Sequence, residues 1–171
     1  MVCTISINRP ESLNAFTGET IKELEDAILA TYDDSSIGVI VLTGVGERAF
    51  SAGGDVRWES SGGLEDIEWH VGRHIVDCPK PIIARVPGYA IGGGNRLAYL
   101  CDFTIAAEHA RFGQTGPRVG SPATGYPVSH SANILGHKRA REMWMLCRQY
   151  TALQMLEWGL VNAVVPMEKL D

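Results

Sequence analysis

The chain has 171 residues, of which 45% are hydrophobic and 20% are charged, and its formal net charge is −5 at pH 7. This length suffices for one domain with a sizeable core, and the composition is that of an ordinary globular protein. The acidic charge argues against a nucleic-acid partner and no apolar run is long enough for a membrane helix, so we expect a cytoplasmic protein.

The first half of the chain predicts strands that alternate with helices. Residues 2–7 alternate in polarity, as in a half-buried strand, and residues 37–42 form an apolar run typical of a strand covered on both faces. Thr17 is a candidate helix cap. We expect strands over residues 2–7 and 37–42, helices over 20–32 and 64–76, and a loop over 56–63.

The second half continues this alternation, which predicts a single layered α/β domain. Glycine and proline mark residues 113–122 as an extended loop. We expect strands over residues 82–86, 103–107 and 161–165, and helices over 93–100, 126–135, 137–147 and 151–158.

The four cysteines give no sign of a metal or redox site. Cys3, Cys78, Cys101 and Cys147 are widely scattered, without the C-x-x-C spacing that such sites use. We therefore expect reduced thiols and no bound metal.

Two glycine-rich turns are the most informative local feature. Residues 49–55 read Ala-Phe-Ser-Ala-Gly-Gly-Asp, and residues 88–95 read Gly-Tyr-Ala-Ile-Gly-Gly-Gly-Asn. Each follows a strand-like run, and the second opens a predicted helix. Two such turns can aim two backbone N–H groups at one point, which is how enzymes hold a developing oxyanion. Alternatively, residues 92–94 only permit a tight strand-to-helix turn.

Several short strings occur in an order that resembles the crotonase (enoyl-CoA hydratase/isomerase) superfamily over nearly the whole chain. They are INRP at 7–10, NAF at 14–16, FSAGGD at 50–55, KPIIA at 80–84, GYAIGGG at 88–94, CDFTIAA at 101–107, FGQ at 112–114 and GLVNAVVP at 159–166. The resemblance implies a spiral of ββα units that binds acyl-CoA thioesters. It also implies that residues 1–171 form one core domain, truncated at both ends and without the C-terminal helical region.

Two details of the resemblance point to a subgroup. Residues 114–121 and 138–150 resemble the 1,4-dihydroxy-2-naphthoyl-CoA synthases, and residues 83–95 are as similar to the 2-ketocyclohexanecarboxyl-CoA hydrolases. These relatives make or break a carbon–carbon bond next to a CoA thioester.

The resemblance also implies roles for individual residues. The backbone N–H groups of Gly54 and Gly93 would be the oxyanion donors. The two glutamates of the hydratases fall at Arg96 and Gly116, neither of which can act as a carboxylate base, so simple water addition is disfavoured.

The acid that the synthases and ring hydrolases carry is also missing. Their Ser-x-Asp pattern falls at Ser121-Pro122-Ala123, which keeps the serine and loses the aspartate. Thr124, Tyr126 and His130 are candidates to replace it. An imidazole titrates near neutral pH, although a lone histidine on a helix more often packs or faces solvent.

The triplet Gln114-Thr115-Gly116 matches a corner that binds bicarbonate in some of these synthases. Bicarbonate would then serve as the base, and coenzyme A would enter as part of the substrate, with no tightly bound cofactor. Alternatively, Gln114 and Thr115 only hydrogen-bond the loop backbone.

Substrate-binding candidates surround the two turns. Arg9 lies near the nucleotide end of CoA in relatives, or is an ordinary surface arginine. Asp55 would orient the first turn, and Trp58 would line the acyl pocket or pack against its loop. The full expected set is Arg9, Ala52, Asp55, Val56, Trp58, Tyr89 and Ile91.

Three functions follow. The leading hypothesis is enolate chemistry on a cyclic β-ketoacyl-CoA, with ring-opening hydrolysis preferred over ring closure. The second is an enoyl-CoA hydratase or isomerase, and the third is a non-catalytic acyl-CoA-binding or assembly module. The family further implies a homo-oligomer, a trimer or a dimer of trimers.

Overall fold

A five-stranded parallel sheet is the main element of the computed structural model, which describes residues 1–63, 70–121 and 125–171. In sheet order its strands are β1 (Val2–Ile7), β2 (Val39–Gly44), β4 (Ile82–Val86), β6 (Phe103–Ala107) and β9 (Ala163–Val165). Ile40 and Ile82, which pair across β2 and β4, are both fully buried. The apolar runs of these central strands are thus explained by cover on both faces.

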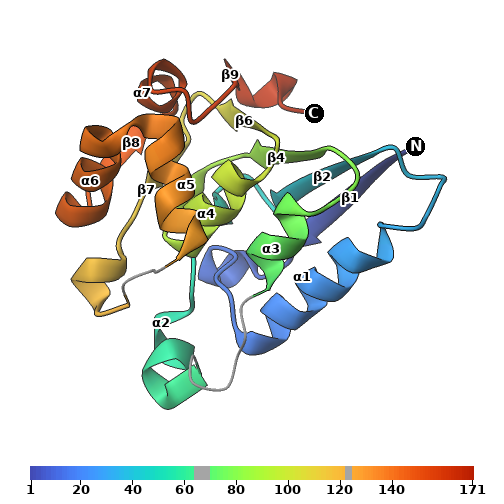
Figure 1. Cartoon of the computed structure of the whole chain (residues 1–171), viewed down its shortest axis with the longest axis horizontal. Coiled ribbons are helices and arrows are strands. Elements are labelled where there is room, and N and C mark those ends of the chain that lie inside the picture. The colour runs from blue at the N-terminus through green and yellow to red at the C-terminus, as the bar shows by residue number, and fades with distance from the viewer. Residues whose placement is uncertain (64–69, 122–124) are drawn as a thin grey trace.

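A second, smaller sheet lies beside the first (Figure 1). Its strands are β3 (Ala49–Ser51), β5 (Tyr89–Ile91), β7 (Arg111–Gly113) and β8 (Gln149–Thr151), and only β8 runs antiparallel. From β2 to β7 the chain alternates between the large and the small sheet. This alternation is the expected spiral of ββα units, so the α/β fold class is confirmed.

The helices form a row along one side of the large sheet (Figure 1). Contacts lead from α1 (Gly18–Ala30) to α3 (Val71–Val76), α4 (Gly93–Leu100), α5 (Tyr126–Leu135) and α6 (His137–Leu146). A further helix, α7 (Ala152–Glu157), follows β8. Helix α4 contacts β4 and β6 of the large sheet and β3 and β5 of the small one. Its start is therefore fixed relative to both sheets.

Helix α1 shows how the sequence determines where a helix begins and which of its faces is buried. The Thr17 hydroxyl accepts a hydrogen bond from the Thr20 amide at 3.4 Å, so the helix begins at Gly18, two residues before the expected start. Ile21, Leu24 and Ile28 share one face and are buried. The expected helix is confirmed.

Two expectations need correction, and a third is tested only in part. Residues 56–63, expected as a loop, contain the helical turn α2 (Val56–Trp58) and a wider π-type turn, Glu59–Gly63, because the Asp55 carboxylate accepts hydrogen bonds from the Arg57 and Trp58 amides. Of the helix expected over 64–76, residues 64–69 lie outside the described residues, and α3 covers Val71–Val76. The loop at 113–122 contains a 3-10 turn, Gly116–Val119.

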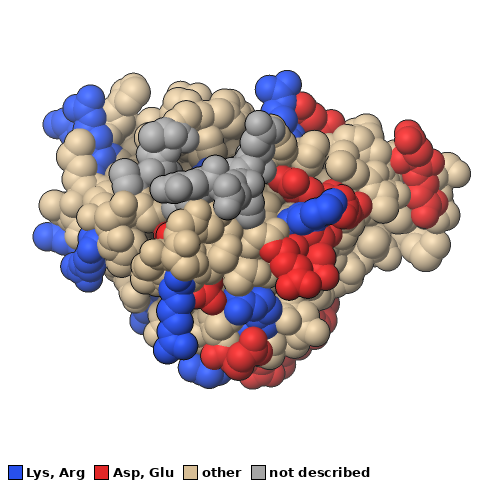
Figure 2. Space-filling view, turned by 90° about the horizontal axis from the view of Figure 1, so that it is seen from below, with Lys and Arg blue, Asp and Glu red and all other residues tan. Residues whose placement is uncertain are grey.

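The surface carries mixed charge on the face drawn in Figure 2, where Lys and Arg side chains are interspersed with Asp and Glu.

Within the described ranges, no helix is long and apolar enough to cross a membrane. The four cysteines are free thiols, as expected.

Candidate active site

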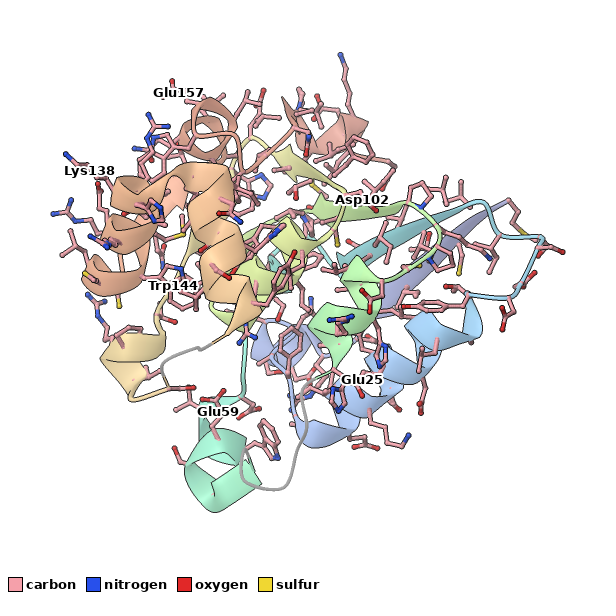
Figure 3. The ribbon with its side chains drawn as sticks, viewed as in Figure 1. Glu25, Glu59, Asp102, Lys138, Trp144 and Glu157 are labelled. Atoms are coloured by element: carbon pink, nitrogen blue, oxygen red, sulfur yellow. The ribbon has the colours of Figure 1, made fainter. Side chains whose placement is uncertain are left out.

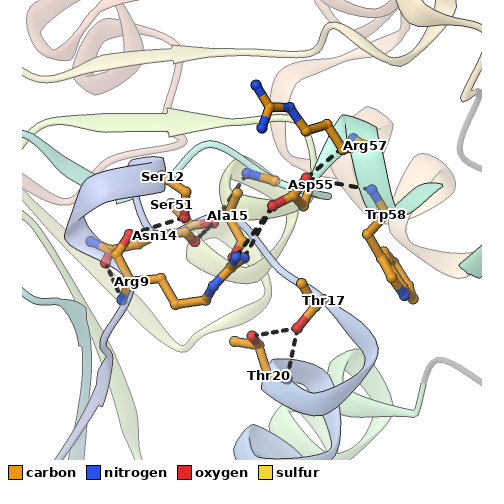
Figure 4. A network of polar contacts seen from close by, with 11 residues as sticks. Arg9, Ser12, Asn14, Ala15, Thr17, Thr20, Ser51, Asp55, Arg57 and Trp58 are labelled. Atoms are coloured by element: carbon orange, nitrogen blue, oxygen red, sulfur yellow. Dashed lines mark hydrogen bonds and ion pairs between the residues drawn. The ribbon is translucent and has the colours of Figure 1, made fainter. Parts of the chain in front are cut away.

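Two buried polar side chains, Asn14 and Ser51, hold the first glycine turn (Figure 4). Asn14 Nδ2 donates to the Ala49 carbonyl at 2.8 Å, and its Oδ1 accepts from the Arg9 amide at 3.0 Å. Ser51 Oγ donates to the Asn14 carbonyl at 2.7 Å and accepts from the Gly53 amide at 3.1 Å. Because buried polar groups are costly to leave unpaired, this network fixes the path of the turn.

The second support of this turn is an ion pair between Arg9 and Asp55 (Figure 4). Both terminal guanidinium nitrogens, Nη1 and Nη2, lie 3.3 Å from Asp55 Oδ2, and Nη1 also donates to the Ala15 carbonyl at 2.7 Å. The other oxygen, Oδ1, accepts from the Arg57 amide at 3.1 Å. Asp55 thus joins the first turn to the start of α2.

The environment of Asp55 shifts its acidity. Burial acts to raise the pKa of this carboxyl, but the hydrogen bonds from the Trp58 and Arg57 amides and the Arg9 guanidinium outweigh burial, so the pKa lies below its usual value. The carboxylate form is therefore favoured in the folded protein.

The second turn links β5 to α4 and is held against the first. The Gly92 amide donates to the Gly113 carbonyl at 2.9 Å, and Gly92 O accepts from the Arg96 amide at 3.1 Å as α4 begins. Gly94 packs so tightly that an added Cβ would lie 2.2 Å from the Ser51 carbonyl oxygen. Only a residue without a side chain fits there.

The two turns touch at Gly53 and Gly93. Gly53 adopts φ +89°, and a Cβ added to it would lie 2.8 Å from the Gly93 nitrogen. The amides on either side of Gly54 are used, since Gly53 N donates to Ser51 Oγ and Asp55 N to the Phe16 carbonyl. Within residues 1–63, 70–121 and 125–171, the amides of Gly54 and Gly93 donate no hydrogen bond. Each turn therefore leaves one backbone donor available to a ligand.

A cavity of about 650 Å³ lies beside these donors. Its volume is within the range of small-molecule sites. Nearly all of the residues expected to be catalytic line it, and two of the expected substrate-binding residues do so as well. The expected residues that line it are Ala52, Gly54, Val56, Gly93, Gln114, Thr115, Gly116, Ser121 and Tyr126.

The other expected residues lie outside this lining. Arg9 and Asp55 are engaged with each other, Trp58 packs against the core, and Tyr89 is 41% exposed on β5. Ile91 is buried in the small sheet. Their roles in binding substrate stay predictions.

His130 does not line the cavity but contacts a residue that does. Its Nδ1 lies 3.0 Å from the Tyr126 hydroxyl, and its ring stacks on Tyr99 with centroids 6.2 Å apart. Tyr99 donates its hydroxyl hydrogen bond to the Pro127 carbonyl, and burial raises the pKa of this phenol. Thr124 and Ala123 lie outside the described residues.

Three of the polar side chains that line the cavity matter most for its chemistry. Glu59 brings a carboxylate, and Arg96 brings a guanidinium whose pKa is lowered by burial. Gln114 is almost fully buried, and its Nε2 has no hydrogen-bond partner among the described residues. Figure 3 shows Glu59 at the end of α2 nearest the body of the domain.

Sequence reasoning named Gln114 but gave no role to Glu59. The sequence did contain a signal for Glu59. Asp55 is a residue type that caps helices, and in the helical turn that it begins, the residue four positions later lies on the same face as Asp55. Among the described residues, no group of three or more His, Cys, Asp or Glu side chains could hold a metal ion.

The alternation between two sheets and the paired glycine turns define a crotonase-type fold. The chain belongs to the enoyl-CoA hydratase/isomerase family, whose model matches residues 1–171.

Solved structures agree with this assignment. An enoyl-CoA hydratase from Bacillus anthracis is 31% identical with a TM-score of 0.90, and the match covers 99% of this chain and 68% of that one. An enoyl-CoA hydratase subunit from Geobacillus kaustophilus is 32% identical with a TM-score of 0.91, covering 99% and 67%. An enoyl-CoA hydratase/carnitine racemase from Magnetospirillum magneticum is 27% identical with a TM-score of 0.90, covering 99% and 67%.

Proposed function

We propose that this chain binds an acyl-CoA thioester in the cavity and stabilises its enolate with the backbone N–H groups of Gly54 and Gly93. The observation that carries the proposal is that two touching turns each leave one amide without a partner in the part of the chain that the structure describes. Gly93 is also the first residue of α4, where the helix dipole favours negative charge. One donor of this kind is worth about 2.7–4 kcal/mol of transition-state stabilisation.

We further propose that the substrate is a cyclic β-ketoacyl-CoA and that the reaction is hydrolytic ring opening, with ring closure as the reverse chemistry. A water oxygen adds to the ring ketone, the bond to the α-carbon breaks, and its electron pair forms the thioester enolate, which is then protonated at that carbon. The product gains a carboxylate. The cation of Arg96 in the cavity suits that charge, and Arg96 and Gly116 offer no carboxylate pair for water addition.

A second candidate is enoyl-CoA hydration or isomerisation. It is favoured by the similar solved structures from Bacillus anthracis and Geobacillus kaustophilus, which are enoyl-CoA hydratases. Both candidates use the same oxyanion donors and differ in the reacting carbons.

We propose bicarbonate as an alternative source of the base, bound at Gln114 and Thr115. Its support is the buried Nε2 of Gln114, which has no hydrogen-bond partner in the described ranges, and Gln114 lines the cavity together with Thr115. A turnover rate that falls in carbonate-free buffer and returns on adding bicarbonate is the expected result, whereas an unchanged rate argues against this base.

We also propose that the chain assembles as a homo-oligomer, a trimer or a dimer of trimers. Met145 and Leu146 at the end of α6, and Leu153 and Leu156 on α7, are exposed apolar side chains that suit subunit contact. Light scattering coupled to gel filtration would give the mass, and a monomer would contradict the proposal.

The test of the function is a comparison of two substrates. The protein is incubated separately with 2-ketocyclohexanecarboxyl-CoA and with crotonyl-CoA, and products are followed by mass spectrometry. We expect the first to gain one water and open. Turnover of crotonyl-CoA alone would establish the second candidate, and thermal stabilisation by both esters without turnover would indicate a binding module.

A further inference from the structure

We propose that Glu59 is the group that carries the proton to and from the α-carbon of the bound thioester. The inference rests on the proposed function, because it takes the thioester oxygen to be held by Gly54 and Gly93. It assigns a catalytic residue at a position where neither the glutamates of the hydratases nor the aspartate of the synthases would fall.

The first support is position. Glu59 is half-buried, lines the cavity, and lies directly against the first oxyanion residue. A Cβ added to Gly54 would lie 1.7 Å from Glu59 Oε1 and 2.6 Å from its Cδ. The carboxylate therefore occupies the space on the side-chain face of Gly54, next to the amide proposed to grip the substrate oxygen.

The second support is availability. In the described part of the chain the Glu59 carboxylate forms no ion pair and accepts no hydrogen bond. The neighbouring acids differ, because Asp55 is paired with Arg9 and Asp77, which also lines the cavity, is paired with Arg73. A carboxylate without a partner among the described residues can act on a ligand without first breaking an ion pair.

The third support is the way in which Glu59 is held. Its amide donates to the Asp55 carbonyl at 2.8 Å, so one helical turn connects it to the residue that follows Gly54. Asp55 in turn is fixed by Arg9 (Figure 4). The Arg9–Asp55 pair thus acts as a positioning element that sets Glu59 relative to Gly54.

The chemistry follows from this placement. A thioester oxygen between the amides of Gly54 and Gly93 puts the carbonyl carbon one bond away and the α-carbon one bond further. Glu59 takes the α-proton, the C–H electron pair becomes the C=C bond of the enolate, and the carbonyl π pair moves to the oxygen, where the amides hold its charge. In the reverse direction the protonated Glu59 returns the proton and the enolate reverts to the thioester. In ring opening, the same acid protonates the enolate left after the carbon–carbon bond breaks.

The test measures this proton transfer alone. Butyryl-CoA, which has neither a double bond nor a ketone in its acyl chain, is incubated in D2O with the wild type, Glu59→Gln, Glu59→Asp and the control Glu23→Gln, an exposed acid on α1. Incorporation of deuterium at the α-carbon is followed by mass spectrometry across a range of pH. Calorimetric titration gives the Kd of butyryl-CoA, and thermal unfolding checks the fold of each variant.

We expect Glu59→Gln to lose about 100-fold or more in exchange rate, with a Kd within about threefold of the wild type. Glu59→Asp, which keeps a carboxylate at a shorter reach, should retain exchange at a reduced rate, and Glu23→Gln should match the wild type.

The experiment distinguishes failure of the Glu59 proposal from failure of the proposed function. Exchange by the wild type and by Glu59→Gln at rates within threefold, with binding intact, would overturn the inference and leave the proposed function standing. A wild type that neither binds butyryl-CoA nor exchanges its α-proton would overturn both.

Discussion

The amide nitrogen of Gly93 lies so close to Gly53 that a methyl group added to Gly53 would stand 2.8 Å from it. Two turns that are 40 residues apart in the sequence are therefore one unit in the fold. The small sheet brings them together, because β3 and β5 run parallel and deliver both turns at the same edge.

The first prediction concerns the donor on α4. Gly93→Pro removes the N–H while leaving a residue that is tolerated at the first position of a helix. We expect its turnover of 2-ketocyclohexanecarboxyl-CoA to fall by about 100- to 1000-fold. Steady-state kinetics with mass-spectrometric detection is the measurement.

Gly93→Ala is the matched control for that change. It keeps the N–H, and its Cβ would lie 3.1 Å from Phe16 Cε2, a contact that a small movement of the ring relieves. We expect most of the activity to remain. Equal loss in both variants would mean that packing, and not the donor, was disturbed.

The second prediction concerns the contact between the two turns. Gly94→Ala would place a Cβ 2.2 Å from the Ser51 carbonyl oxygen, where backbone must move on one side or the other. We expect the free energy of unfolding to fall by about 1–3 kcal/mol, measured by urea denaturation. Gly38→Ala is the control, because its nearest contact would be an ordinary 4.0 Å. A Gly94→Ala variant as stable as Gly38→Ala would contradict the packing.

The third prediction concerns acid stability. Because the pKa of folded Asp55 lies below its usual value, its carboxylate stabilises the fold at neutral pH, and this contribution disappears as the pH falls through the folded pKa. Asp55→Asn keeps a helix cap and loses the ion pair with Arg9. We expect it to be about 1–2 kcal/mol less stable at pH 7, a difference that shrinks below about pH 4.

Urea unfolding at several pH values checks this expectation. Asp26→Asn, which removes the exposed Lys22–Asp26 pair on α1, should change the free energy of unfolding by less than about 0.5 kcal/mol. A gap between the wild type and Asp55→Asn that stays constant down to pH 3 would exclude the proposed linkage.

The sequence predicted the parts of the fold that have long, regular patterns. Strands such as β4 carry enough apolar residues to be recognised, and Thr17 marks the start of α1. The strands of the small sheet have three residues each, too few for a period to show, and they are fixed by pairing with distant segments. The bounds of the glycine turns were predictable, but the sheet that joins them was not.

The residues of the candidate site also fall into those that the sequence indicates and those that only the fold brings together. Gly54, Gly93 and Gln114 stand in recognisable strings, so sequence reasoning named them. Glu59 does not, and the role proposed for it depends on its contact with Gly54, which follows from the local helical turn after Asp55. The partner of Arg9 was equally hidden, because an ion pair over 46 positions has no local signature.

The last prediction concerns Gln114, whose buried Nε2 has no hydrogen-bond partner among residues 1–63, 70–121 and 125–171. A buried unpaired donor costs about 1–3 kcal/mol, so Gln114→Met, which has a similar shape and no donor, should raise the free energy of unfolding of the ligand-free protein by up to that amount. If Nε2 serves the ligand, the same variant should be stabilised less by an acyl-CoA. Urea unfolding with and without 2-ketocyclohexanecarboxyl-CoA measures both effects, and Gln149→Met on the exposed face of β8 is the control. A variant that gains stability yet keeps the full stabilisation by ligand would remove Gln114 from the binding site. A variant that gains stability without ligand and is stabilised less by the ligand would mean that the unpaired Nε2 costs the free protein stability because it serves to bind the ligand.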